Sequence, residues 1–227
     1  GQPTNAVFGF TSMLMKLIRE KSPDYLAVAL DRGKPKERLE LFEDYKATRK
    51  PMPDNLRSQI PLVEKVLEAM NIPVCVIEDQ EADDVIATLV RAAEKKGLTT
   101  YIATGDKDLF QLIGESTYVY DGRNDTVFDE DAAVEKYGVR PDQLGDWLAL
   151  VGDASDNIPG VQGIGPKGAT ELMKEFGSLD AILENTEAIE KKGTRKKIEE
   201  DVDSARLSRK LVELKTDLDV GVEISDC

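Results

Sequence analysis

The sequence predicts an α/β fold with a mainly parallel sheet and flanking helices over residues 1–137, followed by a helical region over residues 138–227. In the first part, short apolar segments alternate with longer segments of helical periodicity. Beyond it the pattern becomes helical. Acidic residues directly follow several of the apolar segments, and the carboxyl ends of parallel strands are where such sheets form their active sites.

The expected elements follow from these periodicities. We expect helices over residues 6–20, 56–70 and from the acidic residues at 81–84 to about 96, and strands over 25–30, 74–77 and 100–103. Residues 118–120 and 126–128 flank a polar turn and predict a hairpin or a pair of edge strands. We expect further helices over residues 142–151, in the segment that ends near Phe176, and over most of residues 184–215.

The composition excludes several functional classes. With 41% hydrophobic and 33% charged residues and no apolar run of membrane-spanning length, we expect a soluble cytoplasmic protein. Histidine is absent, which removes Ser–His and Cys–His pairs and the usual zinc ligand. The cysteines, Cys75 and Cys227, require no oxidising compartment. The net charge of −14 alone argues against a nucleic-acid partner, but a site built of carboxylates would inflate that figure.

Carboxylates cluster at the expected strand ends. Glu81, Asp83 and Asp84 precede a helix, where acidic residues are also common because they stabilise its first turn. The pattern recurs in three further places, at Asp31, at Asp106 with Asp108, and at Asp153 with Asp156. Because Mg²⁺ and Mn²⁺ prefer oxygen ligands, the repetition favours a divalent-metal site.

Two further segments suggest anion binding. Residues 32–53 are basic and too polar to be core, and the alternative interpretation is a solvated, mobile surface loop. The closely spaced glycines of residues 158–167 precede a helix, which suits close approach of a phosphate to backbone N–H groups. A glycine-rich turn alone is weak evidence, but Lys167 lies beside this one.

Together these motifs resemble the 5′-nuclease domain of bacterial DNA polymerase I, in the flap-endonuclease superfamily. The matching stretches occur in the family's order over nearly the whole chain, at residues 3–10, 45–49, 81–84, 104–108 and 152–160. The resemblance implies a PIN-like nuclease core followed by a helical duplex-binding region with a helix–turn–helix-like element.

The resemblance also implies the site residues. The divalent-metal cluster would comprise Asp31, Glu81, Asp83, Asp84, Asp106, Asp108, Asp153 and Asp156. We expect Asp31, Glu81, Asp83 and Asp106 to be catalytic, with Asp108 joining Glu81, Asp83 and Asp106 around two ions about 4 Å apart. Asp84, Asp153 and Asp156, with Asp31, would hold outer waters or the second ion.

DNA-binding residues carry over in the same way. Tyr45, Lys46 and Arg49 match the family's clamp near the cleaved strand. Gly160, Gly163, Gly165 and Lys167 match its duplex-binding turn, which can also carry K⁺. The chain departs from the family pattern at Gly168, where Thr is usual, and it begins after the family's first strand, which supplies one more catalytic Asp.

The expected function is therefore 5′→3′ hydrolysis of DNA at flaps, nicks and gaps in replication and repair, by a monomer that forms the N-terminal domain of a DNA polymerase I. The given chain, lacking the first Asp, is expected to be poorly stable and nearly inactive. The alternatives are a non-cleaving nucleic-acid-binding module with this fold, and a Mg²⁺-dependent phosphohydrolase for small substrates. The latter would have a compact pocket in place of the long basic segment and the glycine-rich turn.

Overall fold

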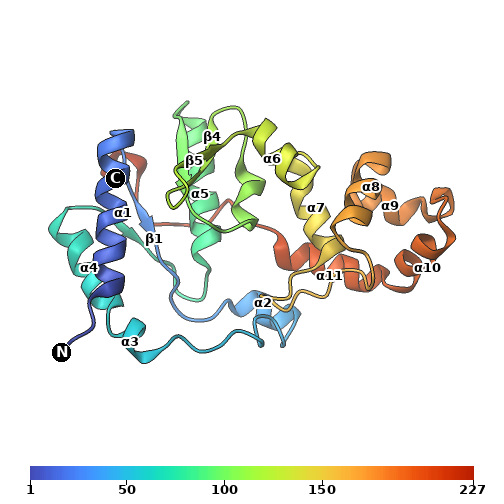
Figure 1. Ribbon diagram of the computed structural model, residues 1–227, viewed down its shortest axis with the longest axis horizontal. Helices are drawn as coiled ribbons and strands as arrows, with labels where there is room; N and C mark the ends of the chain where they lie inside the picture. Colours follow the sequence, from blue (N-terminus) through green and yellow to red (C-terminus); the bar gives the residue numbers. More distant parts are fainter.

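The computed structural model describes residues 1–227 and confirms the α/β class, with strands paired in two small sheets (Figure 1). Strand β1 (Val28–Ala29) is parallel to β2 (Val74–Cys75). Strand β3 (Thr100–Ala103) is parallel to β4 (Thr117–Asp121), which pairs antiparallel with β5 (Thr126–Phe128) and so confirms the hairpin. The expected parallel pairing is present, but the sheet is interrupted between β1 and β3.

The β1–β2 pair is covered by two helices that have their own small core. Helix α1 (Asn5–Lys21) packs against α4 (Ile60–Ala69) through Leu14, Val63 and Leu67. The single helix expected over residues 56–70 is instead divided into α3 (Asp54–Arg57) and α4. Proline in the first turn of α4 explains the division, because its ring lacks the N–H that a continuous helix needs.

An apolar cavity of about 770 Å³ separates the two sheets. Val28 lines it from β1, Ile102 from β3 and Ile86 from α5 (Ala82–Lys95). The cavity extends to Thr104 and Gly105, directly before Asp106. The unpaired edges of β1 and β3 therefore face the same apolar space, and its far end lies next to an expected metal ligand.

The main core runs through both parts of the chain. It joins α5, the 3₁₀ helix η1 (Asp108–Leu112), α7 (Pro141–Val151) and α11 (Val202–Val212), with α6 (Glu130–Tyr137) beside them. Leu144 and Leu148 of α7 are almost fully buried in it. No break in the hydrophobic core coincides with residue 137, so the loops of both parts that carry the expected metal ligands rest on one rigid support.

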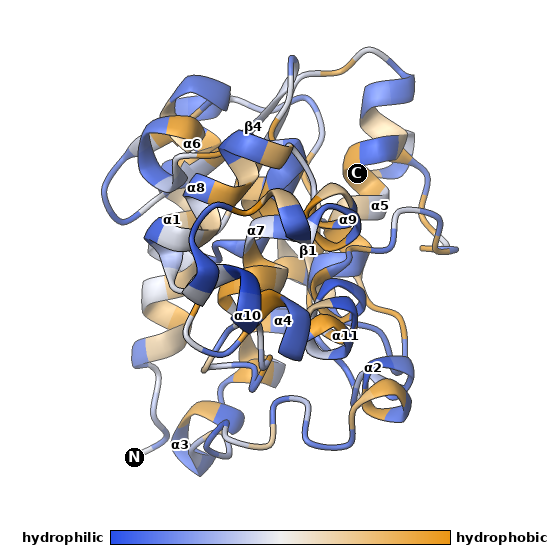
Figure 2. Cartoon of the chain, turned by 90° about the vertical axis from the view of Figure 1, so that its right-hand side faces the viewer, coloured by the Kyte–Doolittle hydropathy of each residue, from blue (hydrophilic) through white to orange (hydrophobic).

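The remaining helices form one end of the molecule (Figure 1). They are α8 (Pro166–Phe176), α9 (Leu179–Glu184), η2 (Thr186–Ala188) and α10 (Lys192–Glu200), and Figure 2 shows the mainly hydrophilic α10 on this face. From α11 the chain returns past α5 to η3 (Ile224–Asp226), which contacts α5, so the C-terminus lies near this helix. No helix is both long and apolar enough to cross a membrane.

Candidate metal centre

The first turn of α5 presents the acidic residues at 81–84. Glu81 is the N-cap and its side chain does not cap the helix; the carboxylate of Asp31 does so instead, accepting the N–H of Ala82 at 2.7 Å. Asp31 itself is exposed. Free N–H groups and the helix dipole stabilise negative charge at this end. The structure thus places Asp31 as a helix cap at the edge of the site.

The turn after β3 is held by its own side chains. Thr104 Oγ1 accepts the N–H of Asp106 at 2.9 Å, and Asp106 Oδ1 accepts the N–H of Asp108 at 3.0 Å. Leu109 and Phe110, which follow directly, are buried in the main core. Apolar anchoring on one side and local hydrogen bonds on the other fix the positions of both carboxylates.

Asp153 and Asp156 lie on a tight loop between α7 and the glycine-rich segment. Asp153 and Ile158 exchange both backbone hydrogen bonds, at 2.9 and 2.8 Å, and so close the loop. Gly152 and Gly160 both have positive φ, and a Cβ on Gly160 would lie 2.5 Å from the backbone nitrogen of Gly152. This close backbone approach requires glycine at both positions.

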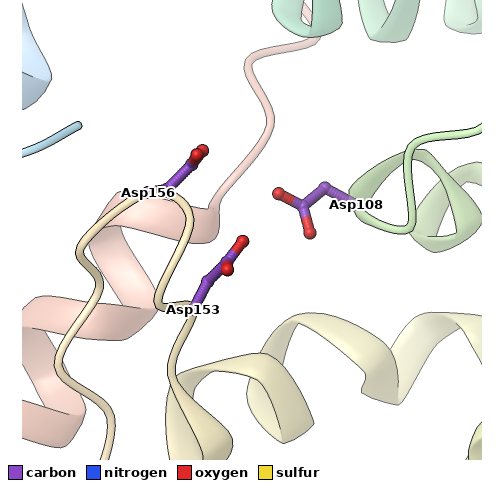
Figure 3. A group of neighbouring side chains, drawn as sticks. All are labelled: Asp108, Asp153 and Asp156. Carbon is purple, nitrogen blue, oxygen red and sulfur yellow. The ribbon is translucent and has the colours of Figure 1, made fainter. Parts of the chain in front are cut away.

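Asp108, Asp153 and Asp156 point toward one another from the two facing segments (Figure 3). One carboxylate oxygen from each lies within 4.8 Å of the others, and Asp108 Oδ1 is buried without a hydrogen-bond partner. A buried carboxylate oxygen left without a donor costs free energy, and a cation would satisfy it. This all-oxygen donor set fits Mg²⁺ or Mn²⁺.

The pKa values show how these charges act on one another. Burial, followed by the charges of Asp106, Asp108 and Glu81, raises the pKa of Asp83 to about 7. Burial also raises the pKa of Asp108 to about 6, against the lowering effect of Lys107. Asp83, Asp106 and Asp108 therefore form a group of mutually repelling carboxylates, which a divalent cation would relieve.

Lys107 lies between two members of the cluster. Its ammonium donates to Asp153 Oδ2 at 2.5 Å and lies 3.6 Å from Asp108 Oδ1. Burial would raise the pKa of Asp153, but the hydrogen bonds from Lys107 and Ser155 outweigh it and lower that pKa. The sequence analysis did not single out Lys107, although its position between Asp106 and Asp108 was a visible signal.

The basic segment lies against the candidate metal centre. Most of residues 32–53 are exposed, as their polarity predicts, but Arg38 and Tyr45 are buried. Tyr45 is buried in the main core, and its hydroxyl donates to Glu81 Oε2 at 3.1 Å. Lys46 pairs with Glu81 and lies 3.4 Å from Asp156 Oδ2, while Arg49 donates to Asp156 Oδ1 at 2.8 Å. The clamp residues therefore neutralise Glu81 and Asp156 directly.

Backbone contacts hold the same segment in place. Lys46 donates its N–H to the carbonyl oxygen of Asp156 at 2.9 Å, and Asn157 Nδ2 donates to that of Asp44 at 2.7 Å. Burial would lower the pKa of Lys46, but its hydrogen bond and attraction to Glu81 raise it. Lys46 thus remains a cation next to the acidic group, and this part of the segment is fixed rather than mobile.

Asp84 differs from its neighbours. It is fully buried, and Arg38 donates to both of its oxygens, at 2.5 and 2.9 Å. The N–H of Lys215 donates to Asp84 Oδ1 at 2.9 Å. Both oxygens are therefore occupied by protein donors. In the sequence, Arg38 is one cation among several in the basic segment. The one signal that could have identified it is that a buried carboxylate needs a partner.

The glycine-rich turn has free donors on its surface. No protein acceptor takes the N–H of Gly163 or Gly165, and Lys167 is exposed and makes no ion pair. The carbonyl oxygen of Gly163 accepts from Lys197 Nζ at 2.8 Å. Gly160, by contrast, is buried, with its N–H donated to Ser208 and its carbonyl accepting from Ser204. Gly160 shapes the loop from inside.

The structure thus brings most of the expected residues into one region. Asp83, Asp106 and Asp108 interact electrostatically, Asp108 joins Asp153 and Asp156, and Glu81 is linked to Asp156 through Lys46. Asp31 lies at the edge, and Asp84 is turned into the protein.

The two parts of the chain match two models of known families. Residues 1–138 match the model of the 5′-3′ exonuclease N-terminal resolvase-like domain, and residues 139–227 match that of the 5′-3′ exonuclease C-terminal SAM fold. The chain belongs to the 5′-3′ exonuclease family.

Individual relatives give the same assignment. The chain is 42% identical to a 5′-3′ exonuclease of Aquifex aeolicus over 226 residues, which is 100% of this chain and 77% of that protein. It is 44% identical to DNA polymerase I of Caldicellulosiruptor bescii and 40% identical to that of Bacillus subtilis, over 99% of this chain in both cases. The chain spans only 27% and 26% of those polymerases.

Solved structures show a shared fold at lower identity. A structure of T5 5′-exonuclease with bound zinc matches with a TM-score of 0.83 and 22% identity, over 94% of this chain and 82% of that one. The catalytic core of Rad2 in complex with DNA substrate matches with a TM-score of 0.62 and 22% identity, over 94% and 73%.

Proposed function

We propose that the chain is a divalent-metal-dependent nuclease that hydrolyses DNA 5′→3′ at flaps, nicks and gaps, and that it forms the 5′-nuclease part of a DNA polymerase I acting in replication and repair. The observation that carries the proposal is the meeting of Asp108, Asp153 and Asp156 within 4.8 Å, bordered by Lys46 and Arg49. The family assignment and the polymerase relatives support it.

The metal set that we propose consists of Glu81, Asp83, Asp106, Asp108, Asp153 and Asp156, holding two Mg²⁺ or Mn²⁺ ions. Such ions would activate a water molecule for attack and stabilise the leaving oxygen, in a chain that has no histidine to act as general base. Asp31 supports the site by capping α5.

The cations of the basic segment would hold the cleaved strand. Lys46 and Arg49 now bond to Glu81 and Asp156, and a phosphate offers them equivalent anionic oxygens in the same place. Tyr45 is buried, and burial together with the charge of Glu81 raises the pKa of its hydroxyl. The hydroxyl therefore stays protonated and acts as a hydrogen-bond donor. These residues orient the strand beside the carboxylates.

The duplex would be held about the glycine-rich turn. The free N–H groups of Gly163 and Gly165 and the exposed ammonium of Lys167 form an anion-binding surface at the start of α8. We propose that a K⁺ ion shares this turn, where the carbonyl of Gly163 also accepts from the ammonium of Lys197. We expect the protein to act as a monomer in the cytoplasm.

We also propose that one more strand, upstream of Gly1, fills the cavity between β1 and β3. Both facing edges are unpaired, the lining is apolar, and the cavity ends at Gly105. A strand parallel to β3 would therefore bring its last residue next to Asp106. Extending the chain upstream by an Asp-bearing strand should raise the melting temperature and flap cleavage together; equal cleavage with and without it would contradict this proposal.

The decisive experiment uses this extended protein with a labelled 5′-flap duplex and, beside it, a generic phosphatase substrate. Metal-dependent cleavage of the flap alone supports the nuclease. Flap binding without cleavage would indicate a binding module, and cleavage of the small substrate would indicate a phosphohydrolase. EDTA should abolish cleavage, and added Mg²⁺ or Mn²⁺ should restore it.

A further inference from the structure

Arg38 connects three parts of the molecule that are far apart in the sequence. It belongs to α2 (Lys36–Leu41), Asp84 belongs to α5, and residues 211–215 end α11 and begin the return toward the C-terminus. Arg38 Nε donates to the carbonyl of Leu211 at 3.0 Å, and its Nη2 donates to that of Glu213 at 2.7 Å. With the two bonds to Asp84, the guanidinium uses donors on all three of its nitrogens.

The same guanidinium touches the metal centre. Arg38 Nη1 lies 2.7 Å from Glu81 Oε2, the oxygen that also accepts from Tyr45. Glu81 is therefore fixed on one side by Arg38 and on the other by Lys46. Because Arg38 is itself fixed by Asp84 and by two backbone carbonyls, the end of α11 and Glu81 share one rigid connection.

The segment after α11 is bound along α5 by further contacts. We define residues 213–218 as the C-terminal strap. The N–H of Lys215 donates to Asp84, its ammonium donates to Gln80 Oε1 at 2.8 Å, and the N–H of Leu218 donates to Thr88 Oγ1 at 3.4 Å. The strap thus follows the helix that carries Asp83 (Figure 1).

We infer that Arg38 is a positioning residue that, through Asp84 and Glu81, fixes the C-terminal strap and the end of α11 to the metal centre, and that Asp84 binds no metal. Asp84 is fully buried, and its oxygens are held by Arg38 and by the N–H of Lys215. Glu81 differs, because one of its oxygens is held by the ammonium of Lys46, which is partly exposed. Asp83, the neighbour of Asp84, has no strong cationic partner. A displacement of α11 or of the strap would move Glu81. This inference rests on the proposed metal centre.

Three variants of the extended protein separate positioning from ligation. Mn²⁺ affinity is measured by calorimetry and by the electron paramagnetic resonance of bound Mn²⁺. Asp83→Asn should weaken Mn²⁺ binding by more than the roughly 10- to 100-fold typical of outer-shell changes. Arg38→Met should weaken it by about 10-fold, within that outer-shell range. Adding Asp84→Asn to Arg38→Met should cause no further loss, because Asp84 acts only through Arg38.

A further loss of 10-fold or more in Arg38→Met/Asp84→Asn relative to Arg38→Met would make Asp84 a ligand and overturn the inference. If Asp83→Asn also left Mn²⁺ binding unchanged, the proposed metal centre itself would be wrong, which is a distinguishable outcome. Failure of this inference and failure of the proposed metal centre are thus detected in different variants.

A second pair of variants tests the strap in a protein whose Arg38 and Asp84 are intact. Lys215→Pro removes the N–H that bonds to Asp84, whereas Lys215→Ala keeps it and removes only the ammonium contacts. Lys215→Pro should raise hydrogen exchange at Leu218 and weaken Mn²⁺ binding at least about 3-fold, a small part of the outer-shell range. Lys215→Ala should leave Mn²⁺ binding within 2-fold. Unchanged Mn²⁺ binding in Lys215→Pro would contradict the connection, whether or not Arg38→Met folds.

Discussion

Two groups of carboxylates share the first turn of α5 and its surroundings, and they differ in what surrounds them. Asp83 faces Asp106 and Asp108, other carboxylates, and its pKa rises to about 7. Asp84, the next residue, faces Arg38 and the N–H of Lys215. One side of the turn concentrates carboxylates that face one another, with Lys107 as the cation beside Asp108, and on the other side Asp84 is neutralised by protein donors.

The difference shows that residue type and sequence proximity do not define a metal ligand. An unpaired, buried carboxylate costs free energy that a cation can recover, so it has reason to bind one. A carboxylate already saturated by a guanidinium gains nothing and would lose its partner. What separates Asp83 from Asp84 is therefore the charge of the groups that each carboxylate faces.

The sharpest test removes one unpaired carboxylate. Asp108→Asn in the extended protein should reduce flap cleavage by far more than 100-fold, because its unpartnered oxygen lies among the proposed metal ligands. Cleavage is followed on a labelled 5′ flap. Asp131→Asn, an exposed residue of α6, is the matched control and should cut at the wild-type rate. Normal cleavage by Asp108→Asn would remove Asp108 from the metal set.

The neutralisation of Asp84 is tested through the free energy of unfolding. Arg38→Met should lower the free energy of unfolding by about 3–5 kcal/mol, because Asp84 would remain as a buried and uncompensated charge. Arg38→Met/Asp84→Asn should recover much of that loss, and Arg57→Met, on an exposed side chain, should cost little. Urea denaturation measures all three. A small effect of Arg38→Met would show that Asp84 has another source of compensation.

In the metal-free protein, the pH dependence of the free energy of unfolding distinguishes carboxylates whose pKa is raised from those whose pKa is lowered. The folded-state pKa values of Asp83 and Asp108, about 7 and about 6, lie above the ordinary value of 3.8, so their protonated forms are favoured in the folded protein. Their contribution to the free energy of unfolding is complete below about pH 4 and is lost as the pH rises toward 7. Asp153, whose pKa is lowered, contributes in the opposite direction and loses its contribution below about pH 4.

We therefore expect Asp83→Asn to flatten the fall in stability between pH 4 and pH 7, and to stabilise the metal-free protein at pH 7. Denaturation in EDTA over this range provides the measurement. An unchanged pH profile in Asp83→Asn would mean that its carboxylate does not repel Asp106 and Asp108.

The smallest expected effect lies at the glycine-rich turn. Lys167→Ala should weaken duplex binding about equally for all sequences and reduce the slope of log affinity against log salt by about 0.9, the value of one phosphate contact. Lys174→Ala, an exposed lysine in the last turn of the same helix, is the control. Lys46→Ala and Arg49→Ala should instead affect mainly substrates with a free 5′ end. Equal salt slopes in wild type and Lys167→Ala would restrict this turn to a structural role.

The sequence alone determined the local features of this protein. Periodicity gave α1, α5 and β3 with nearly correct bounds, because amphipathic patterns and turn residues act over a few neighbouring positions. The recurrence of Asp106, Asp108, Asp153 and Asp156 after apolar segments was also visible, and it predicts an oxygen-rich metal site. The family motifs extended this to the clamp residues and the glycine-rich turn.

Only the tertiary structure decided which carboxylates are free. Asp83 and Asp84 are equivalent in a local pattern, and Arg38 lies more than a helix and a strand away from both in the sequence. Whether a carboxylate meets a guanidinium or another carboxylate depends on packing between distant segments, here α2, α5 and the strap after α11. Electrostatic energies depend on these distances and on burial, neither of which is encoded in the spacing of residues along the chain.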